Sequence, residues 1–218
     1  QPESVGNARV IPMSNQAGQS NLRRRLSEAG IMVDDGDPAL GQILEEIKAR
    51  EAAGYSYDTA QASFELLARR ALGQMPRFFE VKRYRVTVER RKNKYDKMVS
   101  LSEAVVVVKI GDQKMLSVSE SMDETGSDRG PVNALSKALA KDLGPYQSYI
   151  DTIRLVDFKV RITQGGTEAV TRVIIDSEDD TGRRWSTVGV SANIVDASFE
   201  ALLDAVHWKL IQDGAPAS

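Results

Sequence analysis

The sequence predicts an α+β fold in which two βββα units follow a small helical region. The apolar spacing changes from the helical period to the alternating period of strands near Gly73–Pro76. Beyond that point three strand-like runs precede an amphipathic helix, and the same order returns after about 70 residues, too long for a solenoid repeat. We therefore expect helical subdomains over residues 1–75 and one domain with an internal pseudo-two-fold axis over residues 76–218.

Composition restricts the function more than it identifies it. The 218 residues hold 29 Lys and Arg against 31 Asp and Glu, so the net charge of −2 favours neither nucleic acid nor an anionic membrane as partner. The absence of Cys excludes disulfides and thiolate ligands. No apolar run or signal peptide suggests a membrane, so we expect a cytoplasmic protein. A start at Gln1 rather than Met suggests a piece of a longer protein.

The region before Gly73 is predicted to be helical. Ser20–Glu28 can form a short helix, and the apolar stripe of Pro38–Ala53 predicts a longer one that Asp37 caps. A third helix, Ala60–Leu72, follows Asp58 as its expected cap. So few helices have little core of their own, and we expect them to pack on something else, such as a domain that is missing here. The aspartates before Pro38 lack the spacing of a calcium loop, so a turn is the better interpretation.

The first βββα unit begins after Pro76. Phe79–Glu89, Ala104–Ile110 and Met115–Ser121 are predicted strands, and a helix is expected from Pro131 to about Leu143. The basic stretch Arg90–Lys97 joins the first two strands. We interpret it as a solvated hairpin tip rather than as a phosphate site.

The second unit repeats this order with clearer signals. Ile153–Ile162, Ala169–Ile175 and Trp185–Val190 are predicted strands. A long helix then starts near Ile194, with Ser191 or Asn193 as its cap. Gly189 leaves room for a close backbone approach. The helix also has one side of small residues, which would let it lie close to a sheet or another helix: Ala197, Ala201 and Ala205.

Several motifs in this order resemble one enzyme family. Gly130–Leu135 reads GPVNAL, Gly165–Ala169 reads GGTEA, and Trp185–Ser191 reads WSTVGVS. These resemble segments of the regulatory domain of the α-isopropylmalate and citramalate synthases, and the likeness extends over nearly the whole chain. Val156–Ile162, VDFKVRI, and Val5–Asn7 are especially similar to the citramalate branch.

The resemblance implies a non-catalytic part of a larger enzyme. In the family a (β/α)₈ barrel precedes this region and binds a divalent metal through a His-x-His pair and carboxylates. The present chain has a single histidine, His207, which we interpret as a packing residue of the last helix. We therefore expect no catalytic residue, no metal and no cofactor here; the parent protein would be an acetyl-CoA-dependent acyltransferase, with its absent barrel as a partner. Residues 1–75 would be linker subdomains, and 76–218 the allosteric dimerisation domain.

The resemblance also implies a small-molecule effector at a homodimer interface. The citramalate branch implies isoleucine, and the isopropylmalate branch implies leucine. Backbone N–H groups behind Pro131, at a helix N-terminus, suit the carboxylate of an amino acid. Carbonyls around 165–169 suit its ammonium group. Matched to the family, the effector-binding residues are Gly130, Val132, Leu135, Leu155, Phe158, Ile162, Ala169 and Val190.

Other interpretations remain open at this point. Each apolar residue of the expected pocket would also suit an ordinary core, and the domain would then serve dimerisation alone. A nucleic-acid module is a weaker alternative, because βββα units occur in RNA-binding proteins and Arg83–Lys97 is locally basic. The acidic net charge and the lack of paired aromatic residues for stacking disfavour it.

Overall fold

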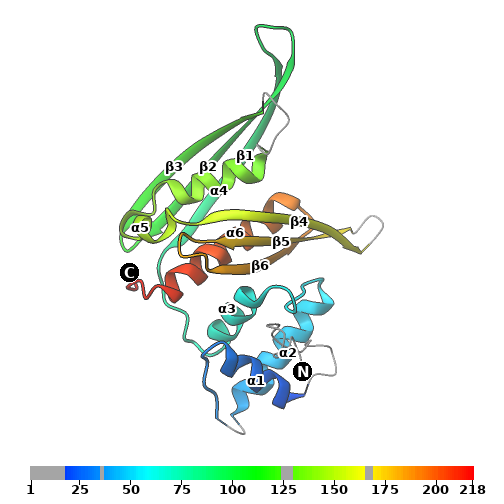
Figure 1. The fold of residues 1–218 in the computed structure, drawn as a ribbon, viewed down its shortest axis with the longest axis vertical. Helices are drawn as coiled ribbons and strands as arrows, with labels where there is room; N and C mark the ends of the chain where they lie inside the picture. Colours follow the sequence, from blue (N-terminus) through cyan, green and yellow to red (C-terminus); the bar gives the residue numbers. More distant parts are fainter. Residues whose placement is uncertain (1–17, 35–36, 124–129, 165–168) are drawn as a thin grey trace.

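The structure, a computed structural model, describes residues 18–34, 37–123, 130–164 and 169–218. Three helices open the chain (Figure 1): α1 (Gln19–Glu28), α2 (Pro38–Ala52) and α3 (Gln61–Ala71). The predicted helices are confirmed, and Asp37 caps α2 by accepting from the Ala39 N–H at 2.8 Å. The expected cap of α3 was wrong. Ala60 occupies that position and offers no side-chain cap, while the Asp58 carboxylate lies 3.6 Å from the Arg25 guanidinium.

The first unit is a three-stranded antiparallel sheet and a helix, as predicted. Its strands are β1 (Glu80–Lys92), β2 (Met98–Ile110) and β3 (Gln113–Asp123), in the order β1-β2-β3, and its helix is α4 (Pro131–Lys141). The β1–β2 ladder continues to the pair Lys92–Met98, so the hairpin is longer than the sequence predicts. Figure 1 shows it extending well past α4.

The second unit repeats the first. After the short α5 (Gln147–Ile150) come β4 (Arg154–Gln164), β5 (Val170–Glu178) and β6 (Arg184–Ser191), again antiparallel in sequence order. The long helix α6 (Ile194–Gln212) closes the unit, and the Asn193 side chain caps it by accepting from the Val195 N–H at 2.9 Å. The predicted duplication of βββα units is therefore confirmed.

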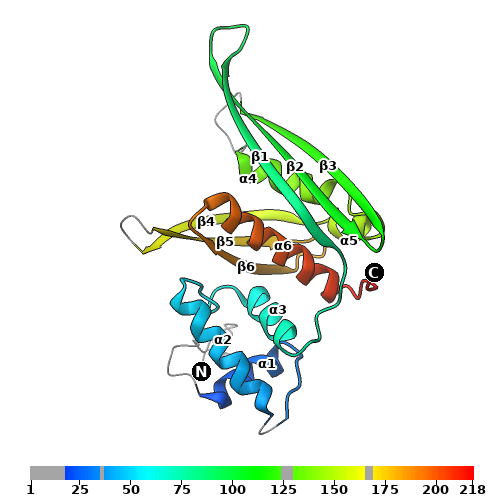
Figure 2. The ribbon, with the colours of Figure 1, turned by 180° about the vertical axis from the view of Figure 1, so that it is seen from behind.

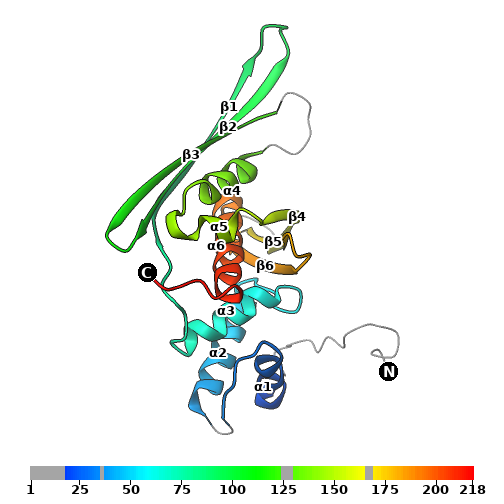
Figure 3. The ribbon, with the colours of Figure 1, turned by 60° about the vertical axis from the view of Figure 1, so that its left-hand side comes forward.

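Helices α4 and α6 lie between the two sheets and share one core with them (Figure 3). Val106 of the first sheet, Leu135 of α4, Val173 of the second sheet and Phe199 of α6 are all buried in it. Helix α6 also contacts β1, where the Tyr84 and Phe199 rings lie 4.0 Å apart. The two units therefore form one domain with a common hydrophobic core.

The close approach expected at Gly189 is present. A Cβ atom on Gly189 would lie 1.9 Å from the Ala197 carbonyl oxygen and 3.0 Å from the Ala201 nitrogen. The neighbouring Thr187 donates its hydroxyl to the Ala201 carbonyl at 2.8 Å. The small residues on both elements thus allow the α6 backbone to contact the β6 backbone.

The opening helices cover the other face of the second sheet. Val188 of β6 is buried among side chains of α2 and α3, including Ile43 and Phe64, and Ile174 and Val190 pack against the same cluster. The opening helices therefore pack on a sheet of this same chain, and not only on an absent domain as the sequence suggested. Within the described ranges, no helix has the length and hydropathy needed to cross a bilayer.

Candidate functional site

The N-terminus of α4 carries no side-chain cap. Gly130 occupies the N-cap position in an extended conformation and Pro131 follows at the first helical position. A Cβ on Gly130 would meet nothing within 4 Å. Because α6 is capped by Asn193, the two equivalent helices differ here, and only α4 lacks a side-chain acceptor at its cap residue. Such an end can bind an anionic group through backbone N–H donors.

Strand β4 exposes an unusual amount of apolar surface. Phe158, Val160 and Ile162 share one face, since they stand opposite Ile175, Val173 and Thr171 in the ladder. Val173 and Ile175 are fully buried. Val160 is nevertheless 41% exposed and Ile162 is 70% exposed. The helical layer therefore ends before β4 does, and an edge strand is left with an open apolar face.

The uncapped helix end and this strand end lie on the same side of the domain. Figures 1 and 2 show α4 and α6 running in the same direction, with their N-terminal ends toward the far end of β4. Ala169, half-buried, directly precedes β5 at this end. The predicted residues that the structure brings to this region are Gly130, Val132, Phe158, Ile162 and Ala169.

Leu155 lies near the other end of β4. Seven residues separate it from Ile162, and at about 3.3 Å per residue the two are roughly 20 Å apart along the strand. Leu155 lines a cavity of about 40 Å³ between α4, α6 and the second sheet, together with Leu139, Ser177 and Leu202. A single small amino acid cannot contact both Leu155 and Ile162 of one chain.

Two further predicted pocket residues are placed elsewhere. Leu135 has no exposed surface and belongs to the shared core. Val190 packs against the opening helices, on the opposite face of the second sheet. Strand alternation turns Gly189 toward α6 and therefore turns Val190 away from it. The part of Leu135 and Val190 in effector binding stays a prediction. Val160 was not among the predicted pocket residues, but it shares the exposed face of β4 with Phe158 and Ile162.

A polar network joins the opening helices to α6. The Ser63 hydroxyl donates to the Asp204 carboxylate at 2.7 Å and accepts from the Val188 N–H at 3.0 Å. Arg70 donates to the other Asp204 oxygen at 2.6 Å. Burial raises the pKa of Asp204, while the Arg70 guanidinium opposes that shift. Glu200 accepts from the Tyr55 hydroxyl at 2.7 Å. Arg50 of α2 lies 3.6 Å from the same Glu200 carboxylate. A shift of α6 would therefore displace its contacts with both α2 and α3.

Comparison with known proteins identifies the domain. Residues 58–210 match the LeuA allosteric (dimerisation) domain. The chain belongs to this family. The match begins just before α3 and reaches almost to the end of α6. It therefore includes α3 and both βββα units, but neither α1 nor α2. The expected domain boundary at residue 75 stays a prediction.

Individual relatives are (R)-citramalate synthases. That of Geobacter sulfurreducens is 43% identical over 211 residues, covering 96% of this chain and 38% of that protein. That of Aquifex aeolicus is 40% identical over 215 residues, with 97% and 38% covered. A probable 2-isopropylmalate synthase of Archaeoglobus fulgidus is 27% identical, with 96% and 37% covered. This LeuA-type chain thus spans under two fifths of these relatives' lengths.

Proposed function

We propose that this chain is the C-terminal regulatory part of a citramalate synthase, which condenses acetyl-CoA with pyruvate in isoleucine biosynthesis. Isoleucine is proposed to bind where two copies meet and to act as feedback effector. The identities of 38–43% to (R)-citramalate synthases, against 27% to the isopropylmalate synthase, favour this branch of the family. The barrel that precedes such a domain would carry the catalytic residues and the metal.

The observation that carries the proposal is an uncapped helix N-terminus near an open apolar strand. The α4 N-terminus offers N–H donors to a carboxylate, and no Gly130 side chain competes for them. Phe158 and Ile162 offer an apolar surface to an aliphatic side chain. Ile162 is 70% exposed in one chain, so a second copy is proposed to cover it and complete the site. Homodimerisation agrees with membership of a dimerisation-domain family.

Regulation is proposed to work by linkage between the effector and the linker helices. Isoleucine would favour one arrangement of the dimer and hence one position of α6. The Asp204 and Glu200 hydrogen bonds would pass that position to α2 and α3. A coupling free energy of about 1–3 kcal/mol is sufficient for useful feedback.

Calorimetric titration with isoleucine, leucine and valine tests the proposal. We expect isoleucine to bind most tightly, although isomers that differ only in shape are separated by about 1–3 kcal/mol. Binding of none of the three would remove the effector hypothesis. Tighter binding of leucine would assign the chain to the isopropylmalate branch, the alternative that the weaker relatives represent.

A variant separates an effector site from a purely structural module. Ala169→Phe places a large ring at the start of β5, within the proposed site. We expect it to abolish isoleucine binding while sedimentation still reports a dimer. If the wild-type chain dimerises without binding any branched-chain amino acid, the domain serves dimerisation alone.

A further inference from the structure

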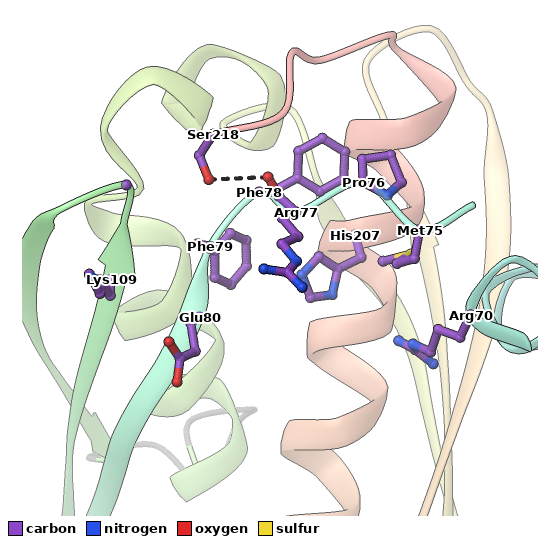
Figure 4. A pocket seen from close by; sticks show the side chains of 11 residues that line it. Arg70, Met75, Pro76, Arg77, Phe78, Phe79, Glu80, Lys109, His207 and Ser218 are labelled. Atoms are coloured by element: carbon purple, nitrogen blue, oxygen red, sulfur yellow. Dashed lines mark hydrogen bonds between the residues drawn. The ribbon is translucent and has the colours of Figure 1, made fainter. Parts of the chain in front are cut away.

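A hollow lies toward the C-terminal end of α6, where the opening helices join the domain. Its volume is about 530 Å³, and it is bordered by α3, the segment 75–80, the β2 end and α6. Figure 4 shows its wall, with side chains from these four segments facing one space. We call it the junction pocket. It contains none of the residues of the proposed effector site, and β1 and α6 extend between the two.

Cationic side chains predominate in the junction pocket. Arg70, Arg77 and Lys109 line it from three different elements, against the carboxylate of Glu80 and, in the 218-residue chain, the terminal carboxylate of Ser218. Lys109 also lies 3.5 Å from the fully exposed Asp112 carboxylate. Glu80 is already paired with Lys82 at 2.6 Å, and its side chain is 64% exposed. The pocket therefore keeps an excess of positive charge within a partly enclosed space, which strengthens attraction for anions.

The arginines are able to bind a further group. Arg70 uses one terminal nitrogen on Asp204, and its side chain is 41% exposed, so other N–H donors face the pocket. Arg77 makes no ion pair with any residue in the described part of the chain. In Figure 4 both guanidinium groups point into the hollow. Guanidinium groups bind phosphate and carboxylate oxygens with two parallel hydrogen bonds.

The remaining wall is aromatic and uncharged. The His207 ring stacks on Phe79 at 4.8 Å between ring centres, with Phe78 behind it at 6.2 Å. Burial, with Arg70 nearby, lowers the pKa of His207 to about 4, so the imidazole is neutral at pH 7. Met75 and Pro76 extend this apolar surface. A ligand here would meet cations on one side and flat apolar groups on the other.

We infer that the junction pocket binds a small organic anion. Its phosphate or carboxylate oxygens would lie on Arg77, Arg70 and Lys109, and its apolar or aromatic body on Phe79, His207 and Met75. Such a ligand would bridge the α3 end, the connecting segment and the domain. It would thereby stabilise their arrangement independently of the amino-acid effector.

Calorimetry with three simple probes tests this inference on the 218-residue chain. Inorganic phosphate, phenyl phosphate and benzoate are titrated at constant ionic strength. We expect phenyl phosphate to bind more tightly than inorganic phosphate, because only it also covers the aromatic wall. If phenyl phosphate binds more tightly than benzoate, the natural ligand class is a phosphate ester. If benzoate binds more tightly, the natural ligand class is a carboxylate. Failure of all three to bind would overturn the inference.

Matched variants locate the binding. Arg77→Gln removes a pocket cation, and Arg91→Gln makes the same charge change on the exposed hairpin tip. We expect roughly tenfold weaker binding of the tightest probe to Arg77→Gln and unchanged binding to Arg91→Gln. His207, the only histidine of the chain, also gives one assignable NMR signal that an aromatic probe should shift. Equal affinity in both variants, or an unmoved His207 signal, would contradict the inference.

Discussion

At the scale of single residues, Gly189 shows how one missing side chain sets the distance between two elements. Gly189→Ala would place a methyl group 1.9 Å from a backbone oxygen of α6, so the helix must move. We expect it to lower the free energy of unfolding by about 1–3 kcal/mol or more. Gly130→Ala is the matched control, because its methyl would meet nothing within 4 Å. Urea titration measures both, and equal losses would refute this role of Gly189.

His207 belongs to the same scale and predicts a pH dependence. Its pKa is lowered to about 4 in the folded chain by burial and by Arg70, against about 6.5 when unfolded. Between these values the unfolded state binds more protons, so stability falls as the pH falls from 6.5 toward 4. We expect His207→Gln to flatten this slope by up to about 1.4 kcal/mol per pH unit. Parallel stability curves for the two proteins between pH 6.5 and 4 would contradict the assignment.

At the scale of elements, hydrogen bonds hold α3 against α6 and β6. Ser63→Ala would leave the Val188 N–H and one Asp204 oxygen without this partner, at a cost of about 1–3 kcal/mol in unfolding free energy. Ser102 is the control, because it is equally buried but its hydroxyl makes no hydrogen bond to any described residue. Ser102→Ala should change stability little. Thermal unfolding compares them, and the prediction fails if Ser63→Ala is no more damaging than Ser102→Ala.

The element scale also shows what sequence patterns can and cannot predict. Both βββα units followed from changes in hydrophobic period, and Asn193 was correctly expected as a possible cap of α6. The cap of α3 was not predicted, because the helix begins at Gln61 and Ala60, which has no capping side chain, precedes it. Likewise, the alternation of apolar residues predicted that Val190 is in a strand, but it did not show on which face of the sheet the Val190 side chain lies.

At the scale of the whole molecule, the open face of β4 predicts dimerisation through this strand. Ile162→Glu places a charge on a side chain that is 70% exposed in one chain. If a second copy covers this side chain, burying the charge should raise the dimer dissociation constant tenfold or more. A tenfold change corresponds to roughly 1.4 kcal/mol of dimerisation free energy. Met32→Glu is the control, since Met32 is 80% exposed in the connection between α1 and α2. Sedimentation equilibrium would refute the assignment if both variants dimerise alike.

The sequence by itself determined the order of elements, their approximate bounds and the duplication, because hydrophobic period and capping are local properties of the chain. Its motifs also pointed to the family. Only the tertiary structure decided which predicted residues meet. Leu135 and Val190 are packed in cores, and Leu155 lies far along the strand from Ile162. The junction pocket is likewise a tertiary feature, since Arg70, Lys109 and His207 come together only when three distant segments pack.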